Sequence, residues 1–575
     1  MSLRCQLRGL RDSFSAYFRS NFTRREFRFV VSLLFLVTVD QLTARVYTHR
    51  PESIAELLSL PGIEWYWFVK DVVCWTALLS IPLFLTGKYA RSVYLPFIIV
   101  FVLATAACAF TWANFRMQLD GDWIGIILGS STDEFLFFLK SYALKFRFFA
   151  GMLLLGAVLY ALCGITKKLK PVKPSATGGC VAFACLALFV LMMPVSSAFK
   201  SSPAFFLLMD STDNWTHYRK MARIKHAPKI PEDLKSPVRA TKLTLGVFIL
   251  GESATRNHWS LYGYPKKTTP EMDAIKDELA VFTDLVTPVS NTAKAMELIF
   301  THSALERPDN PKCTYAQMLK ATGFDVSLYS SQSRWGRWDG VESFIFAGSD
   351  PLVFLDEEHL TGPWYDDKLL DYLDRDISSQ TNQSVTILHL RGSHFPAQAH
   401  YPCENRPAAL EKFIAETSGP NADTNSYDTS IFFTDSILGK TVERLKQRGG
   451  PAWMIYLSDH GDSIGANSWR LTNDRNVWEV PMIIWFSADY ANKFPDIVSA
   501  VKKARTLPLQ SDLLLAGFLH IAGVKGWEIG SETDFLSELF KPRFPRLIEG
   551  GKLEYNWIAS PEGTSPSILH KTVIP

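Results

Sequence analysis

The stretch VFILGESATRNHWSLYGY, Val247 to Tyr264, decides how the second half of this chain is interpreted. Its apolar first residues predict a buried β-strand. The strand pattern stops at a glycine, and a carboxylate, Glu252, follows directly in a polar segment. Since ligands of open α/β sheets bind beyond the carboxyl ends of the strands, Glu252 is a candidate functional residue.

Strand-like and helix-like segments alternate over residues 241–575, which predicts an α/β domain with a mainly parallel sheet flanked by helices. The strand candidates are Leu245–Leu250, Asp325–Tyr329, Val385–Leu390, Ala452–Leu457 and Pro481–Phe486. The helix candidates include Ser430–Lys446 and Gln510–Ile521.

Residue types that bind metals follow three of these strands. Glu252 follows the first, the segment HLRGSH carries His389 and His394, and the segment SDHGDS carries Asp459 and His460. Carboxylates and imidazoles are ligands of zinc and manganese. A single histidine at a strand end is usually a structural residue, but three such groups at one edge of a sheet predict a metal site.

Thr292 lies where a polar turn meets a predicted helix, in the segment SNTAKAMELIF. A hydroxyl at a helix start is normally an N-cap. The same position suits a nucleophile, because a bound metal lowers the pKa of a coordinated hydroxyl and a helix N-terminus favours phosphate. The residues alone leave both interpretations open.

The first 200 residues contain long apolar runs that a globular core of this size does not need. Five runs are close to the roughly 20 residues of a membrane-spanning helix. They are Phe27–Val46, Val69–Leu85, Val93–Trp112, Phe146–Ile165 and Cys180–Phe199. We therefore expect a five-helix transmembrane domain over residues 1–200 and a bridging helix and linker over residues 201–240. The net charge of +3 over 575 residues gives no argument for nucleic acid binding.

The basic residues predict the orientation of this membrane domain. The leader before the first span is rich in arginine, which places the N-terminus in the cytoplasm. Five crossings from that start place the α/β domain outside the cytoplasm. The segment DGDWIGIILGSSTDEFLFFLKSY, in a loop on that outer side, has apolar residues at helical spacing and predicts an interfacial helix.

Several motifs in order along the chain resemble those of the membrane-bound phosphoethanolamine transferases, which belong to the alkaline phosphatase and sulfatase superfamily. The motifs are GESATRNHWSLYGYPKKTTP, SNTAKA, LYSSQS, WYDDKLL, HLRGSH, NSYDTSIFFTDSIL and SDHGDS. The resemblance covers almost the whole chain. It is closer to the branch that modifies lipopolysaccharide core sugars or other glycans than to the branch that modifies lipid A.

The resemblance implies a zinc-dependent transferase in the bacterial inner membrane, with its catalytic domain in the periplasm. Glu252, Thr292, Asp459 and His460 would bind the catalytic zinc. Thr292 would take phosphoethanolamine from phosphatidylethanolamine as a phosphothreonine ester. An envelope glycan, either lipopolysaccharide core or lipid A, would then accept the group.

The resemblance also implies roles for two histidines beside this centre. His389 and His394 would flank the phosphate or hold a second metal ion, and His394 is a candidate general acid or base. Some relatives carry a further histidine about a dozen residues after the Asp–His pair, where this chain has Thr472 in the segment SWRLTND. That difference weakens the expectation of a second metal ion.

Five further residues are candidates for substrate binding. Ser130 and Glu134 resemble, in spacing, a hydroxyl and a carboxylate that the family places near the donor headgroup. Gln332 and Arg334 follow a predicted strand and could bind phosphate or form a solvated loop, and Arg470 could also contact phosphate.

Related chemistries remain as alternatives. A glycerol-phosphate transferase resembling lipoteichoic acid synthase would share the threonine nucleophile but use phosphatidylglycerol, and a phosphodiesterase of the same superfamily would release its product to water. A sulfatase would need a Cys/Ser-x-Pro-x-Arg motif, which is not found at the nucleophile position. Cys313 and Cys403, the two cysteines of the α/β domain, could form a disulfide in an oxidising compartment.

Overall fold

The computed structural model describes separate stretches of the chain. They are residues 24–49, 58–85, 180–187, short pieces between 96 and 108, 202, 207, 238–239, 244–301, 305, 313–332, 345–346, 348–355, 364–379, 383–464, 474–525, 532–551 and 553–555. The chain divides into two compact units. One contains most of the residues up to Thr216, and the other contains the residues from His217 to Pro575.

The N-terminal unit contains two long helices, α2 (Arg24–His49) and α4 (Gly62–Leu85). An ion pair of 3.1 Å between Arg45 and Asp71 joins them. These helices include the first two predicted spans, whereas the fourth predicted span and most of the third and fifth lie outside the described residues. Among the helices that are described, none is both long enough and apolar enough to span a bilayer.

The C-terminal unit is built on a seven-stranded sheet with the order β3-β9-β8-β2-β7-β5-β6. Its strands are β2 (Leu245–Gly251), β3 (Leu279–Val281), β5 (Asp325–Ser330), β6 (Leu352–Phe354), β7 (Ser384–His389), β8 (Ala452–Ser458) and β9 (Met482–Phe486). The five strands from β8 to β6 run parallel, while β9 pairs antiparallel with both β8 and β3. The mainly parallel sheet and its five predicted strands are confirmed.

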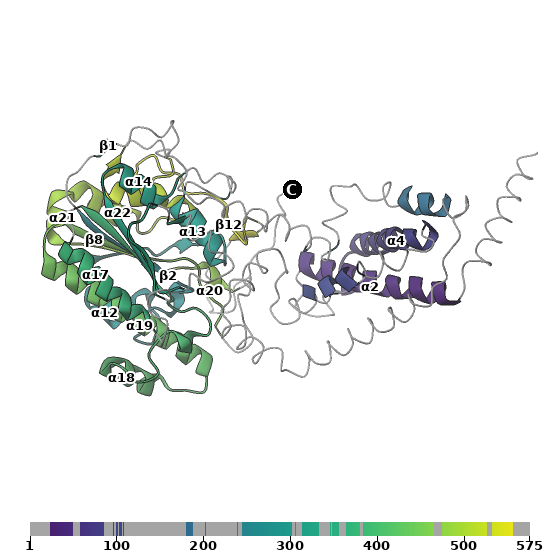
Figure 1. The fold of residues 1–575 in the computed structure, drawn as a ribbon, viewed down its shortest axis with the longest axis horizontal. Helices are drawn as coiled ribbons and strands as arrows, with labels where there is room; N and C mark the ends of the chain where they lie inside the picture. The colour runs from purple at the N-terminus through teal and green to yellow at the C-terminus, as the bar shows by residue number, and fades with distance from the viewer. Residues whose placement is uncertain are drawn as a thin grey trace, which may run out of the picture. The chain divides into compact units, whose positions relative to one another are not determined.

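Helices cover both faces of this sheet (Figure 1). One face carries α12 (Pro270–Ala274), α17 (Leu369–Ser379) and α19 (Ala422–Arg448), and the other carries α13 (Thr292–Phe300), α14 (Tyr315–Ala321), α22 (Pro495–Ala504) and α23 (Leu515–Ile521). Because side chains alternate along a strand, β2 contributes Phe248 and Leu250 to one apolar layer and Val247 and Ile249 to the other. The central strand is therefore buried on both faces, as its continuous apolar run predicts.

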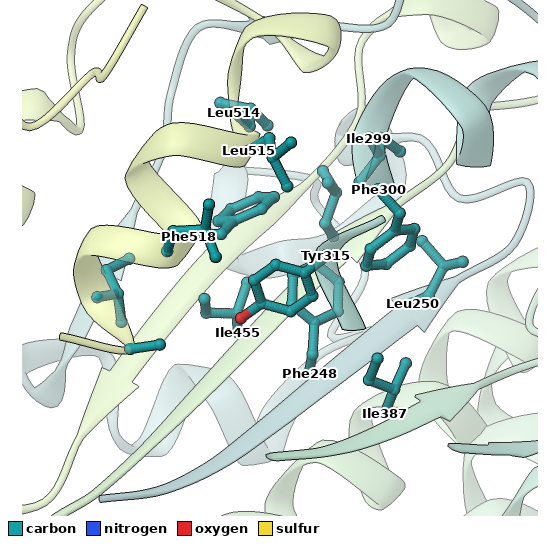
Figure 2. Packing of buried hydrophobic residues seen from close by; sticks show 14 of the residues in the cluster. Phe248, Leu250, Ile299, Phe300, Tyr315, Ile387, Ile455, Leu514, Leu515 and Phe518 are labelled. Carbon is teal, nitrogen blue, oxygen red and sulfur yellow. The ribbon is translucent and has the colours of Figure 1, made fainter. Parts of the chain in front are cut away.

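Aromatic packing fixes α13 against the sheet (Figure 2). Phe248 of β2 meets Phe300, at the end of α13, with ring centroids 5.0 Å apart and an edge-to-face geometry. Phe518 of α23 contacts Phe248 from another side at 5.1 Å. Such contacts add to the free energy of apolar burial and define the orientation of the rings. They hold the helix whose first residue is Thr292.

The structure bears on two smaller expectations from the sequence, the helix bounds and a disulfide. The predicted helix Ser430–Lys446 lies within α19, and the predicted helix Gln510–Ile521 is α-helical from Leu515 onward, as α23. Cys313 is buried and Cys403 is exposed, and the structure does not join them in a disulfide.

Candidate functional site

Neighbouring strands β2 and β8 deliver the acidic and imidazole groups of the site. Gly251 and Ser458, the last residues of these strands, are paired in register, so Glu252 and Asp459 leave the sheet side by side. His460 follows, and all three side chains are completely buried. Their ligand atoms lie within 4.8 Å of one another. The structure thus brings together three of the four predicted zinc ligands from segments about 200 residues apart.

His460 and Asp459 each make hydrogen bonds on the side that faces away from the centre, and these bonds determine which atom of each side chain faces it. His460 Nδ1 lies 2.8 Å from the carbonyl oxygen of Gly461, and since a carbonyl only accepts, Nδ1 carries the proton. In the neutral imidazole Nε2 is then the nitrogen without a proton, and it lies 3.3 Å from Asp459 Oδ2 and 3.6 Å from Glu252 Oε1. Asp459 Oδ1 faces away from the centre and accepts hydrogen bonds from the backbone N–H groups of Ser253 and His460.

Thr292 supplies a hydroxyl to the same centre from the start of α13. Its Oγ1 donates a hydrogen bond of 3.1 Å to Glu252 Oε2 and lies 3.3 Å from His460 Nε2. The N-cap of α13 is Asn291, whose side chain accepts from the backbone N–H of Lys294. The neighbouring asparagine therefore performs the capping role that the sequence left open for Thr292, and the hydroxyl of Thr292 points to the carboxylate cluster.

This donor set suits a divalent transition metal. An imidazole nitrogen, two carboxylates and a hydroxyl converge, and such nitrogen and oxygen donors bind zinc. The carbonyl that holds His460 Nδ1 is the kind of outer partner that orients metal-bound histidines. Glu252, Asp459, His460 and Thr292 could thus hold one ion in the arrangement that the sequence predicts.

Gln332 follows β5, and its side chain reaches the carboxylate of Glu252. Its side-chain amide lies 3.4 Å from Glu252 Oε2 and 3.1 Å from the carbonyl oxygen of Leu390. Its predicted contact with phosphate stays a prediction. The other four predicted substrate-binding residues, Ser130, Glu134, Arg334 and Arg470, lie outside the described residues.

The two histidines of the HLRGSH segment occupy different environments. His389 ends β7, is completely buried and contacts Ser330 Oγ through Nδ1 at 3.0 Å. It is not a member of the three-residue metal cluster. His394 follows a tight turn in which the N–H of Ser393 donates to the carbonyl oxygen of Glu252, and its ring meets that of His400 with centroids 5.9 Å apart. Their predicted catalytic roles stay predictions.

Burial of His389 predicts a pH dependence of stability. Burial lowers the pKa of His389 to about 3, whereas a histidine in an unfolded chain has a pKa of about 6.5. The unfolded state therefore binds more protons between these values, and the free energy of unfolding should fall as the pH drops below 6.5. At pH 5 this residue alone should lower the free energy of unfolding by about 2 kcal/mol relative to its value at high pH. Urea unfolding of the wild-type chain and of His389→Gln at pH 7 and pH 5 should show a smaller loss in the variant, and parallel losses would contradict the assignment.

A buried aspartate that the sequence did not single out organises this turn. Asp366, from the segment WYDDKLL, accepts hydrogen bonds from the backbone N–H groups of Arg391 and Gly392 and from the hydroxyl of Ser331. Burial raises the pKa of Asp366, and these three donors oppose that effect. The only signal in the sequence is that the segment forms part of the family resemblance.

Comparison with known proteins agrees with this geometry. The family described as Sulfatase matches residues 244–524. The Escherichia coli K12 protein with the name Putative transferase YhbX is 27% identical over 67% of this chain and 72% of its own length. Phosphoethanolamine transferase EptA of Salmonella typhimurium is 24% identical over 76% of this chain and 84% of its own length.

A solved structure resembles this chain in fold over most of its length. The integral membrane protein lipooligosaccharide phosphoethanolamine transferase A from Neisseria meningitidis matches 88% of this chain and 98% of its own, with a TM-score of 0.62 at 17% identity. Residues 244–524 match the Sulfatase family, and this solved structure supports the likeness in fold. The resemblance to phosphoethanolamine transferases that the motifs indicate is confirmed, because matched relatives carry that name.

Proposed function

We propose that this chain is a zinc-dependent phosphoethanolamine transferase that acts on a glycan of the bacterial envelope. The observation that carries the proposal is the hydroxyl of Thr292, which lies at a helix N-terminus, 3.1 Å from Glu252 and 3.3 Å from His460. A hydroxyl in this setting is placed to attack a phosphorus atom. The names of the relatives support phosphoethanolamine as the group transferred.

The chain's own residues would carry out a double displacement. Thr292 Oγ1 attacks the phosphorus of phosphatidylethanolamine, the bond to the glycerol oxygen breaks, and a phosphothreonine ester forms. The hydroxyl proton leaves along the existing hydrogen bond to Glu252 Oε2, and His394 protonates the departing diacylglycerol oxygen. An acceptor hydroxyl then attacks the same phosphorus and gives its proton to His394. The bond from phosphorus to Thr292 Oγ1 breaks, and Thr292 recovers its proton from Glu252.

The environment favours this step in two further ways. A phosphate bound at the start of α13 would lie at a helix N-terminus, where backbone N–H groups would stabilise its negative charge. A bound zinc ion would polarise a phosphoryl oxygen and lower the pKa of the Thr292 hydroxyl. Glu252, Asp459 and His460 would hold it.

The lipid donor accounts for the architecture that the sequence predicts. Phosphatidylethanolamine resides in a bilayer, so an enzyme that uses it must be held at the membrane surface. We propose that residues 1–200 form five membrane helices in the inner membrane and that the catalytic unit faces the periplasm. The match over most of the chain to an integral membrane protein supports this arrangement.

The test is an intact mass spectrum of the zinc-loaded full-length chain after incubation with phosphatidylethanolamine or, separately, with phosphatidylglycerol. We expect an adduct of phosphoethanolamine with the first lipid and none with the second. An adduct of glycerol phosphate from the second lipid would favour the alternative resembling lipoteichoic acid synthase. Release of free phosphoethanolamine into water, with no transfer to a glycan acceptor, would favour the phosphodiesterase.

A further inference from the structure

Ser253, directly after the proposed metal ligand Glu252, has an unusual backbone conformation. Its φ of 56° lies in the left-handed region, which favours glycine over residues with a side chain. The residue is completely buried. Non-glycine residues in this region are held there by surrounding structure and are concentrated at functional sites.

The left-handed conformation lets Ser253 contact both carboxylates of the site. Its backbone N–H donates a 3.0 Å hydrogen bond to Asp459 Oδ1, and its hydroxyl donates a 2.7 Å hydrogen bond to Glu252 Oε1. Glu252 Oε2 meanwhile accepts from Thr292. Each oxygen of Glu252 thus has a different hydroxyl partner, and the bond from Ser253 fixes the rotation of the carboxylate about its last bond.

Tyr427 of α19 holds the backbone that follows Ser253, on either side of Ala254. Its hydroxyl donates to the carbonyl oxygen of Ser253 at 2.7 Å and accepts from the backbone N–H of Thr255 at 2.8 Å. Between these contacts, the N–H of Ala254 donates to the hydroxyl of Ser458 at 2.9 Å. The buried ring of Tyr427 therefore connects a helix on one face of the sheet to the turn that carries Glu252.

We propose that Ser253 and Tyr427 are positioning residues of the metal centre. Ser253 orients the carboxylates of Glu252 and Asp459, and Tyr427 keeps the backbone of Ser253 in the left-handed conformation. The proposal rests on the metal site of the proposed function but requires nothing of the lipid donor. Partners that orient metal ligands typically change metal affinity by 10-fold to 100-fold.

The test measures Co²⁺ and Zn²⁺ affinity of the metal-stripped full-length chain by competition with a chromophoric chelator, together with the absorption spectrum of bound Co²⁺. We expect Ser253→Ala and Ser253→Gly to bind about 10-fold to 100-fold more weakly, with an altered spectrum. Tyr427→Phe should weaken binding about 10-fold.

Two comparisons separate positioning from a loss of stability. Tyr329→Phe removes the hydroxyl of a tyrosine in β5, which donates to Asp376, and should leave metal affinity unchanged. Glycine adopts the left-handed conformation without strain, so recovery of affinity in Ser253→Gly alone would show that the hydroxyl does not matter and would overturn the proposal. Wild-type affinity in Ser253→Ala would overturn it as well.

The outcomes also separate this inference from the proposed function. A wild-type chain that binds neither ion would refute the metal site and, with it, the positioning role. A chain that binds Co²⁺ in the expected order of variants, but forms no adduct with phosphatidylethanolamine, would support the positioning role while the lipid-donor assignment fails.

Discussion

Replacement of Thr292 by valine is expected to lower the rate of phosphoethanolamine transfer on the order of 10⁵-fold, which is a typical effect of removing a catalytic nucleophile. Valine has nearly the shape of threonine, so α13 and its Asn291 cap should persist. What disappears is the hydroxyl that lies between Glu252 and His460. Thr292→Ser keeps this hydroxyl and should retain readily measurable transfer.

The measurement is transfer from labelled phosphatidylethanolamine in proteoliposomes, with the zinc content of each variant determined in parallel. Zinc content is needed because Thr292 is also a candidate ligand. Peptide mapping of the wild-type adduct should place the modification on Thr292. If Thr292→Val kept more than about a hundredth of wild-type transfer at full zinc occupancy, another nucleophile would have to be sought.

Much of the framework around this threonine could be predicted because it depends on local pattern. The apolar runs ended in polar residues, and parallel strands place such ends at one edge of a sheet. This reasoning placed Glu252, His389, His394, Asp459 and His460 at one edge, and Glu252, Asp459 and His460 form the cluster found among the described residues. The antiparallel direction of β9 was not predicted, since strand direction depends on connections across the whole sheet rather than on any local signal.

The function of a hydroxyl at a helix start could not be decided from the sequence. Asn291 and Thr292 are adjacent, and both are suitable capping residues. Only the three-dimensional structure shows that Asn291 caps while Thr292 faces the acidic cluster. The left-handed turn at Ser253 and its support by Tyr427 were also missed, because they arise from contacts between segments more than 170 residues apart.

Removal of one metal-binding carboxylate should have the second large effect. Glu252→Gln and Asp459→Asn preserve size and retain hydrogen bonding but remove the negative charge that a divalent cation needs in a buried site. We expect each change to weaken zinc binding by more than about 100-fold, since groups that only orient ligands already contribute up to that much. Transfer should be lost in parallel.

A matched control is Asp435→Asn, which alters another completely buried carboxylate of the same unit. Asp435 accepts hydrogen bonds from the backbone N–H groups of Glu271 and Met272 at the start of α12 and contributes nothing to the metal cluster. This variant should lose stability yet bind zinc normally, as measured by elemental analysis after dialysis. Because the burial of the carboxylates is matched, zinc loss confined to Glu252→Gln and Asp459→Asn would assign the ion to this site. Equal zinc loss in all three variants would instead point to a general effect of unfolding and remove the support for a metal centre at the ends of β2 and β8.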